Sequence, residues 1–274
     1  MNRVLPILTV LLAILVVWYG AAVWLNSTWT YDQAGRAGTV VSFSEVVKDT
    51  MVQERPVLPP PHQVFRGLWD GVAGQAVTSK RSLVYHGWVT LSATLLGFAI
   101  GTGLGILLAV GIVHNRAMDL SVMPWAIASQ TIPILAIAPM IIVVLASLNI
   151  TGIVPKAIIS AYLSFFPVVV GMVKGLRSPD QMQLDLMKTY NASRSETFWK
   201  LRLPSSVPYL FASLKVSVAA SLVGAIVGEL PAGATAGLGA RLLSGSYYGQ
   251  TVQIWAALFA AAALAAGLGM IIGG

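Results

Sequence analysis

Residues that commonly carry out chemistry are few in this sequence and lie far apart. The three histidines, His62, His86 and His114, form no cluster, and there is no cysteine. These types and spacings predict no metal site, no disulfide and no thiol catalysis. The sequence contains no G-x-x-x-x-G-K-[ST] loop to cradle ATP phosphates, no nucleophile elbow and no H-E-x-x-H motif. We therefore expect no catalytic residue, no metal, no cofactor bound by this chain and no enzymatic activity.

The remaining candidates are polar residues and prolines within apolar runs. Lys215 lies inside the run 207–230 and Glu229 near its end. A charge at membrane depth is a functional candidate by default, as a pathway or gate residue. The alternative for Lys215 is snorkelling toward the membrane surface, and for Glu229 a simple helix-end carboxylate. Gln130 and Pro133 are candidates for lining a path, because a proline frees backbone groups that a cavity or a neighbouring helix must satisfy; helix packing is the alternative.

The composition places these residues in a membrane protein. The chain is 56% hydrophobic and only 10% charged, and its mean hydropathy is +0.77. Such a chain has too little polar surface to cover a soluble globule. The net charge of +7 is carried by residues that flank apolar runs, which indicates membrane orientation rather than nucleic-acid binding.

Six apolar runs have about the 20 residues that a transmembrane helix needs. We therefore predict an all-α polytopic membrane protein. The first run follows Arg3, as in a signal peptide, but it is longer than the apolar core of one, and we favour a retained helix. The predicted spans are about Val4–Leu25, Trp88–Val113, Val122–Leu148, Gly152–Val173, Val207–Leu230 and Val252–Gly274.

Lysine and arginine predict the orientation of these spans. If Arg3 is cytoplasmic, Arg116 is also cytoplasmic after two crossings, as the positive-inside rule requires. The densest basic cluster follows after four crossings and is cytoplasmic as well. It comprises Lys174, Arg177, Lys188, Arg194, Lys200 and Arg202.

The segment 26–86 is then external. Lys80 and Arg81 lie on the wrong side for the positive-inside rule, which weakens for loops of about 60 residues. Three prolines, Pro59–Pro61, predict a stiff spacer, and a short amphipathic helix follows them at the membrane surface. Its apolar residues are Val64, Phe65, Leu68, Trp69 and Val72.

Three glycines in the second span recur every four residues. Gly97, Gly101 and Gly105 therefore share one helix face, where a neighbouring backbone approaches closely. The alternative, a dinucleotide-binding fingerprint, fails because the third glycine is one position short and no strand precedes it.

A polar segment between the fourth and fifth spans carries the most specific pattern. Its spacing matches a motif that reads E-A-A, three residues, G, nine residues, I-x-L-P. The matching residues are Asp185, Leu186, Met187, Asn191, Leu201, Leu203 and Pro204. The segment resembles the cytoplasmic loop of permease subunits of binding-protein-dependent ABC importers, in the branch for taurine, alkanesulfonates, nitrate and pyrimidine precursors. The stretches "LPPPHQVFRGLW" and "QTIPILAIAPMIIVVLASL" resemble the same branch, so the likeness covers nearly everything after Val57.

The sequence departs from that motif at its first four positions. Asp185 replaces the motif's Glu, Leu186 and Met187 replace its alanines, and Asn191 replaces its Gly. Asn is the non-Gly residue that best tolerates a left-handed backbone, so we expect the turn at Asn191 to be kept. Leu186 and Met187 are larger than Ala and change the surface that this helix presents.

The resemblance implies a type I ABC importer permease fold with a coupling loop over 175–206. In this interpretation a short docking helix seats in an ATPase groove, with Ser195 in its N-cap region and Phe198 and Trp199 as apolar anchors beside Ala192. Pro204 would end this helix and Pro208 would start the fifth span. The domain organisation is then an N-terminal transmembrane helix (1–25), an external loop with the amphipathic helix (26–86) and a permease core (87–274).

The implied partners are those of a bacterial inner-membrane importer. They are two ABC ATPase subunits that hydrolyse ATP, a periplasmic solute-binding protein that Glu229 is placed to contact, and a second permease copy, expected to form a homodimer. The solute would be a small sulfonate, nitrate or a pyrimidine precursor. Two alternatives use fewer partners. An ion-coupled secondary transporter needs intramembrane acids and an inverted repeat, and a membrane assembly protein leaves the motif unused.

Overall fold

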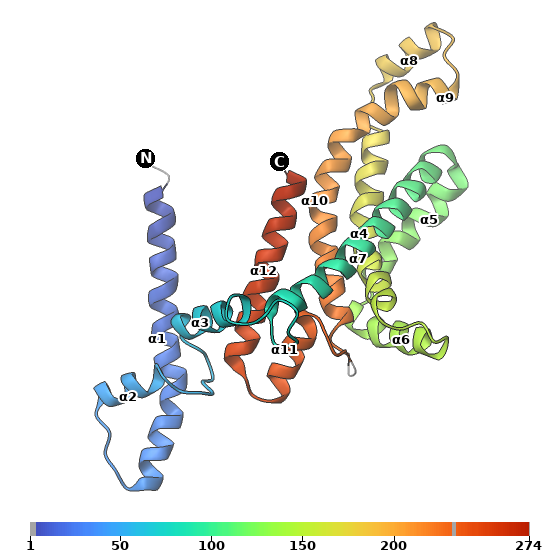
Figure 1. Ribbon diagram of the computed structural model, residues 1–274. Coiled ribbons are helices and arrows are strands. Elements are labelled where there is room, and N and C mark those ends of the chain that lie inside the picture. Colours follow the sequence, from blue (N-terminus) through green and yellow to red (C-terminus); the bar gives the residue numbers. More distant parts are fainter. Residues whose placement is uncertain (1–3, 232–233, 274) are drawn as a thin grey trace. The chain divides into compact units, whose positions relative to one another are not determined.

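The computed structural model describes residues 4–231 and 234–273, and within that part of the chain every regular element is a helix (Figure 1). This confirms the predicted all-α fold class. The helices are α1 (Val4–Ala37), α2 (Phe43–Thr50), α3 (Pro61–Val72), α4 (Leu83–His114), α5 (Arg116–Ser129), α6 (Ile134–Ser147), α7 (Ile153–Leu176), α8 (Gln181–Thr189), α9 (Arg194–Thr197), the π-helix η1 (Phe198–Arg202), α10 (Leu203–Gly228), α11 (Leu238–Tyr247) and α12 (Thr251–Gly273).

Five helices in the described residues are long and apolar enough to cross a membrane. They are α1, α4, α7, α12 and the continuous run Arg194–Gly228, which ends with α10. The pair α5 and α6 passes the same test when counted together, which makes six. The prediction of about six spans is confirmed, and the chain is a multi-pass membrane protein.

The predicted third span is wrong as a continuous helix. α5 ends at Ser129, α6 begins at Ile134, and the two meet at an angle of 99°. Pro133 is the N-cap residue of α6. Its ring disfavours helical backbone in the preceding residue and it has no N–H to donate, so the helix breaks before it. Pro139 lies inside α6, where the helix continues through it.

The chain forms two compact units, which are described separately. One comprises Met1–His86 with Arg241–Ala261, and the other comprises Gly87–Ala240 with Ala262–Gly274.

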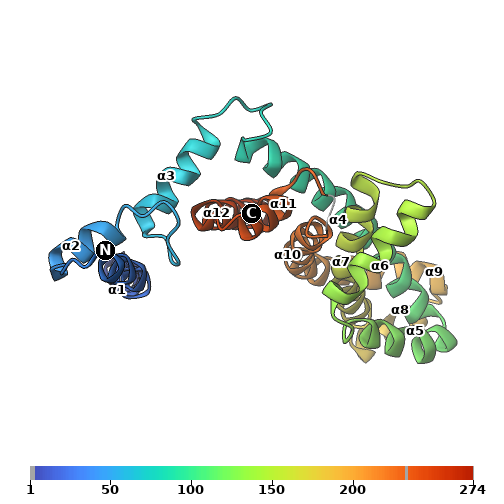
Figure 2. The ribbon, with the colours of Figure 1, turned by 90° about the horizontal axis from the view of Figure 1, so that it is seen from below.

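The second unit is built on α7 and α10, which lie side by side in both views (Figure 1 and Figure 2). Small residues let their backbones approach closely, because lipid gives helices little hydrophobic reason to associate. A β-carbon at Gly224 of α10 would lie only 2.6 Å from the Cα of Ser160. The Ser160 hydroxyl donates to the carbonyl of Ser221 at 2.7 Å, and the Ser217 hydroxyl donates to that of Ser164 at 2.6 Å.

The α4 glycines pack against α7, which agrees with the close helix contact expected from the sequence. A side chain at Gly97 or Gly101 would overlap Ser160 or Ser164, and one at Gly105 would lie within 2.8 Å of Val168. Gly103 points into open space. The four-residue spacing therefore marks the contact face of α4.

In the first unit, α1 continues to Ala37, well past its predicted end at Leu25. At about 50 Å it exceeds the roughly 30 Å hydrocarbon core, so part of it stands outside. The Asn26 side chain fixes that part to the following segment. Its amide donates to the Leu58 carbonyl at 2.9 Å and accepts from the Leu58 N–H at 3.1 Å.

The predicted amphipathic helix is present as α3, directly after the proline spacer. Val64 is buried, whereas Phe65 and Trp69 are exposed on the surface of the chain. Exposed aromatic rings on a surface helix are typical of contact with the membrane interface.

Candidate functional site

A buried carboxylate lies where three helices of the second unit meet. Glu229 caps the C-terminus of α10 and its side chain is 0% exposed. The Thr90 hydroxyl on α4 lies 2.9 and 3.1 Å from its two oxygens, and the Gly239 N–H donates at 3.0 Å. Nζ of Lys156 on α7 lies 3.5 Å from Oε1. A buried charge is stable only when it is paired and hydrogen-bonded, and these contacts provide both conditions.

The segment after α10 wraps around this carboxylate. The Leu238 N–H donates to the Thr90 hydroxyl at 2.8 Å, and Nζ of Lys156 donates to the Ala236 carbonyl at 2.9 Å. Gly237 has φ of +122°, and any side chain there would overlap the Glu229 carboxylate. Glycine is required at this position by both the backbone angle and the close approach.

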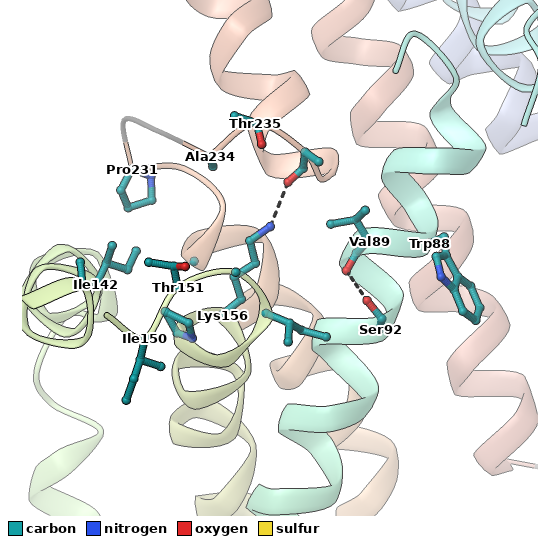
Figure 3. A pocket seen from close by; sticks show the side chains of 16 residues that line it. Trp88, Val89, Ser92, Ile142, Ile150, Thr151, Lys156, Pro231, Ala234 and Thr235 are labelled. Atoms are coloured by element: carbon teal, nitrogen blue, oxygen red, sulfur yellow. Dashed lines mark hydrogen bonds between the residues drawn. The ribbon is translucent and has the colours of Figure 1, made fainter. Parts of the chain in front are cut away.

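A pocket of about 590 Å³ opens beside this cluster (Figure 3). Among the described residues that line it, Lys156 alone is charged, and its side chain reaches from α7 toward the segment that carries Pro231, Ala234 and Thr235. The remaining wall is mainly apolar, with a few hydroxyls. It is lined by Trp88, Val89, Ser92, Ile142, Ala146, Ile150, Thr151, Gly152, Ile153, Pro155, Gly228 and Ala236.

The sequence contains a signal for Lys156, which was not among the predicted site residues. The fourth predicted span begins on the side of the membrane where the fifth ends. Lys156 is four residues inside the fourth, and Glu229 lies at the end of the fifth. Equal depth on neighbouring antiparallel helices predicts an ion pair, because opposite charges at membrane depth tend to pair. No comparable pattern in the sequence predicts that Thr90 and Gly239 contact Glu229.

The other predicted pathway residues lie apart from this cluster. Gln130 caps the C-terminus of α5 at the bend before Pro133, and neither of them lines the pocket. Nζ of Lys215 lies 3.4 Å from the carbonyl of Gly273 at the end of α12. Within the described ranges, no hydrogen bond or ion pair joins any of these three to Glu229.

The polar segment between α7 and α10 has well-defined local structure. Asp180 and Ser193 each form a capping box, with Gln183 and Glu196, at the starts of α8 and α9. Asn191 has φ of 52°, which confirms the left-handed turn expected there. The N-cap of α9 is thus Ser193. The sequence placed Ser195 in the N-cap region, and the observed N-cap lies two residues earlier.

The predicted stop at Pro204 is also wrong. Residues Arg194–Gly228 form one uninterrupted helical run, with Pro204 in the first turn of α10 and Pro208 inside it. The π-turn of η1 explains this continuity, because the Leu203 N–H bonds to the Phe198 carbonyl five residues back. The wider turn leaves room for the proline ring, which would clash in a regular helix.

The predicted coupling residues take distinct positions in this segment. Four apolar side chains are exposed on it: Met182 (80%), Leu186 (55%), Tyr190 (77%) and Trp199 (63%). Phe198 instead packs against the core cluster of α4, α5 and α7, with its ring 5.0 Å from that of His114. The coupling residues are distributed as follows: Asp185, Leu186 and Met187 on α8, Asn191 and Ala192 in the turn, Ser195 in α9, Phe198, Trp199 and Leu201 in η1, and Leu203 and Pro204 at the start of α10.

Asp185 is held within its own helix. Its Oδ1 accepts from Lys188 at 2.9 Å and from Gln181 at 3.0 Å. The Lys188 hydrogen bond, followed by that of Gln181, keeps the pKa of this carboxyl below its usual range. Asp185 is therefore ionised at neutral pH, as the motif's Glu would be.

Residues 101–274, more than half of the chain, match the family described as "Binding-protein-dependent transport system inner membrane component". A probable ABC transporter permease protein of Haemophilus influenzae is 32% identical over 198 residues, covering 72% of this chain and 78% of that protein. A formylaminopyrimidine transport permease protein of Halalkalibacterium halodurans is 31% identical, covering 69% and 71%. A riboflavin transport system permease protein of Chloroflexus aurantiacus is 29% identical, covering 68% and 65%.

We predict strong energetic coupling between Lys156 and Glu229. The change Lys156→Met leaves a buried carboxylate without its counter-charge and should lower the free energy of unfolding by about 3 kcal/mol or more. The double variant Lys156→Met with Glu229→Gln should lose less free energy of unfolding than the sum of the losses in the two single variants. Denaturant unfolding in detergent micelles gives the free energy of unfolding of the wild type, the two single variants and the double variant.

The exposed pair Lys188 and Asp185, at 2.9 Å, serves as the matched control. Its removal by Lys188→Met should leave the free energy of unfolding nearly unchanged, because exposed pairs are screened by water. Simple additivity of the Lys156 and Glu229 changes would show that the two groups do not stabilise each other.

Proposed function

Because the chain belongs to the inner membrane components of binding-protein-dependent transport systems and is a permease subunit of an ABC importer, we propose that it forms half of a solute path with a second, identical copy. Two ABC ATPases attach to segment 175–206, and a solute-binding protein delivers the solute to the opposite side. The family membership excludes the two alternatives of an ion-coupled transporter and a non-transporting assembly protein. In a bacterial inner membrane, the N-terminus and segment 175–206 face the cytoplasm.

The observation that supports this proposal most is the continuity of α9, η1 and α10. At about 1.5 Å per residue, the run Arg194–Gly228 is about 50 Å long; it carries the exposed Trp199 near its start and ends at Glu229. Its contact with α7 makes it stiff. A displacement at the docking end is thereby transmitted to the far end of α10.

At that far end, the cluster around Glu229 serves as the outer closure of the path. The segment after α10 is held by the Gly239 N–H on Glu229, by Leu238 on Thr90 and by Lys156 on the Ala236 carbonyl. Opening requires these contacts to separate together. The ion pair between Lys156 and Glu229, at 3.5 Å, must separate with them.

The pocket favours a neutral, ring-shaped organic solute. The charge of Lys156 is already balanced by Glu229, so the wall presents little net charge to attract a small anion such as nitrate or a sulfonate. The indole of Trp88 and the surrounding apolar side chains suit a planar ring, and the hydroxyls of Ser92, Thr151 and Thr235 suit its polar atoms. Among the solute classes expected from the sequence, we favour a pyrimidine precursor.

We expect Tyr190→Asp to abolish attachment of the ATPase. Tyr190 is 77% exposed and its replacement should not disturb folding, whereas Phe198 is part of the core and is a poor test residue. The permease is purified by an affinity tag after co-expression with the neighbouring ATPase and binding-protein genes, and the bound ATPase is quantified.

Tyr247→Asp is the matched control, because Tyr247 is 75% exposed and the span count puts it on the other side of the membrane. This variant should keep its ATPase. Equal ATPase recovery with both variants would rule out segment 175–206 as the docking site.

Orientation is testable because the native chain has no cysteine. A membrane-impermeant maleimide added to intact spheroplasts should label Ser246→Cys and leave Ser195→Cys unlabelled until the membrane is permeabilised. Both positions are exposed on the chain surface. The reverse labelling pattern would invert the proposed orientation.

The solute class is tested with the assembled importer in proteoliposomes. Formylaminopyrimidine, loaded on the binding protein, should stimulate ATP hydrolysis, and Trp88→Ala should reduce its transport several-fold while ATPase attachment stays intact. Taurine and nitrate serve as comparison solutes. Transport of nitrate or taurine in preference to any pyrimidine would contradict the assignment.

A further inference from the structure

The first unit gathers charged side chains that the permease function leaves unexplained. Arg81 lies on the side of the membrane where the positive-inside rule disfavours it. The structure places it with Arg55 and Arg241 around a pocket of about 630 Å³, together with the acids Glu54 and Asp70. Three arginines and two carboxylates thus share one cavity.

Within the described ranges, no ion pair joins these five side chains to one another or to other residues. Nε of Arg241 is buried without a hydrogen-bond partner, and burial lowers the pKa of its guanidinium. A buried donor left unsatisfied costs about 1–3 kcal/mol. The arrangement therefore suits a bound group that supplies both an anion for the arginines and a cation for the acids.

The pocket lies at a membrane surface. One wall consists of Val252, Gln253 and Ala256, the first two turns of the spanning helix α12. The other walls come from α3, α11, the connecting segments and Leu83, which is the first residue of the spanning helix α4; α3 and α11 are too short to span a bilayer. A ligand in this pocket is thus at the level of lipid headgroups.

A second, apolar groove of about 500 Å³ lies between α1 and α3 and reaches α12 deeper in its span. Phe259, one turn beyond Ala256, lines it with Leu15 and Trp18 of α1 and with Phe65 and Leu68 of α3. Both cavities lie along α3 and α12, with the charged one at the start of α12 and the apolar one farther into its span. This order of polar and apolar surface matches a lipid molecule that enters from the bilayer.

We propose that this amphipathic groove binds a phospholipid whose headgroup carries a phosphate and a primary ammonium, of the phosphatidylethanolamine type. The arginines bind the phosphate, for which the guanidinium fork is well suited. Glu54 and Asp70 bind the ammonium, and one acyl chain follows Phe65 and Phe259. A free phosphate would leave the two acids and the apolar groove without partners.

Native mass spectrometry of the full chain tests this assignment. The protein is released from nanodiscs of phosphatidylethanolamine, phosphatidylglycerol and phosphatidylcholine in equal parts, and the retained lipids are counted. Wild type should keep one phosphatidylethanolamine. Arg81→Gln and Asp70→Asn should each lower this retention about tenfold or more, since each removes hydrogen bonds to a charged group.

The matched controls Arg36→Gln and Asp32→Asn change exposed residues of α1 that line neither cavity, and should retain the lipid. Gel filtration and thermal unfolding verify that each variant is folded. Equal retention of phosphatidylglycerol by wild type, or retention unchanged by Arg81→Gln, would overturn the proposal. Displacement of the lipid by millimolar inorganic phosphate would do so as well, because it would identify a soluble-anion site.

Discussion

The need to neutralise the buried carboxylate of Glu229 constrains most of the second unit. An unpaired charge in this environment would cost several kcal/mol, so its partners must be held at fixed distances. Thr90 comes from α4, Lys156 from α7 and the Gly239 N–H from the segment after α10. One side chain thereby connects α4, α7 and α10 with the first turn of α11.

Close helix packing makes that connection possible. Lipid offers little hydrophobic drive for association, so α4, α7 and α10 depend on short backbone distances and on hydrogen bonds between helices. Glycines on α4 and α10 face serines on α7, and the Ser221 hydroxyl donates to the Thr94 carbonyl at 2.8 Å. Larger residues at these glycines would separate the helices and move Thr90 and Lys156 away from Glu229.

Hydropathy was sufficient to predict the spans, because each backbone group in lipid must be satisfied within a helix. The left-handed turn at Asn191 was also predictable, since few residue types adopt that backbone. The 99° bend before Pro133 was not, because prolines also occur inside unbroken spans, such as Pro167 in α7. Whether a proline breaks a helix depends on which neighbours satisfy the freed backbone groups.

Pro204 is the opposite case, because the sequence predicts a helix end there and the helix continues. A proline after a short polar helix usually marks a stop, yet one wider turn at η1 absorbs it and the run continues. The pairing of Lys156 with Glu229 could have been predicted from the sequence, because the span boundaries give the depth of each residue in the membrane. The positions of Thr90 and Gly239 depend on tertiary packing, which no local pattern encodes.

In the mechanism proposed above, the continuous run from α9 to α10 carries the displacement, and the hydrogen bonds that hold the segment after α10 set the energy that opening requires. Each of the hydrogen bonds that hold the segment after α10 contributes roughly 0.5–1.5 kcal/mol net, so the three together contribute a few kcal/mol. A closure of this strength, as we propose for the Glu229 cluster, would stay shut in nearly all molecules at rest, because 1.4 kcal/mol corresponds to a factor of ten in population. It remains weak enough for a displacement of the docking segment to open it. A stop at Pro204 would have introduced a hinge between the docking helix and α10, and the displacement would have been lost in it.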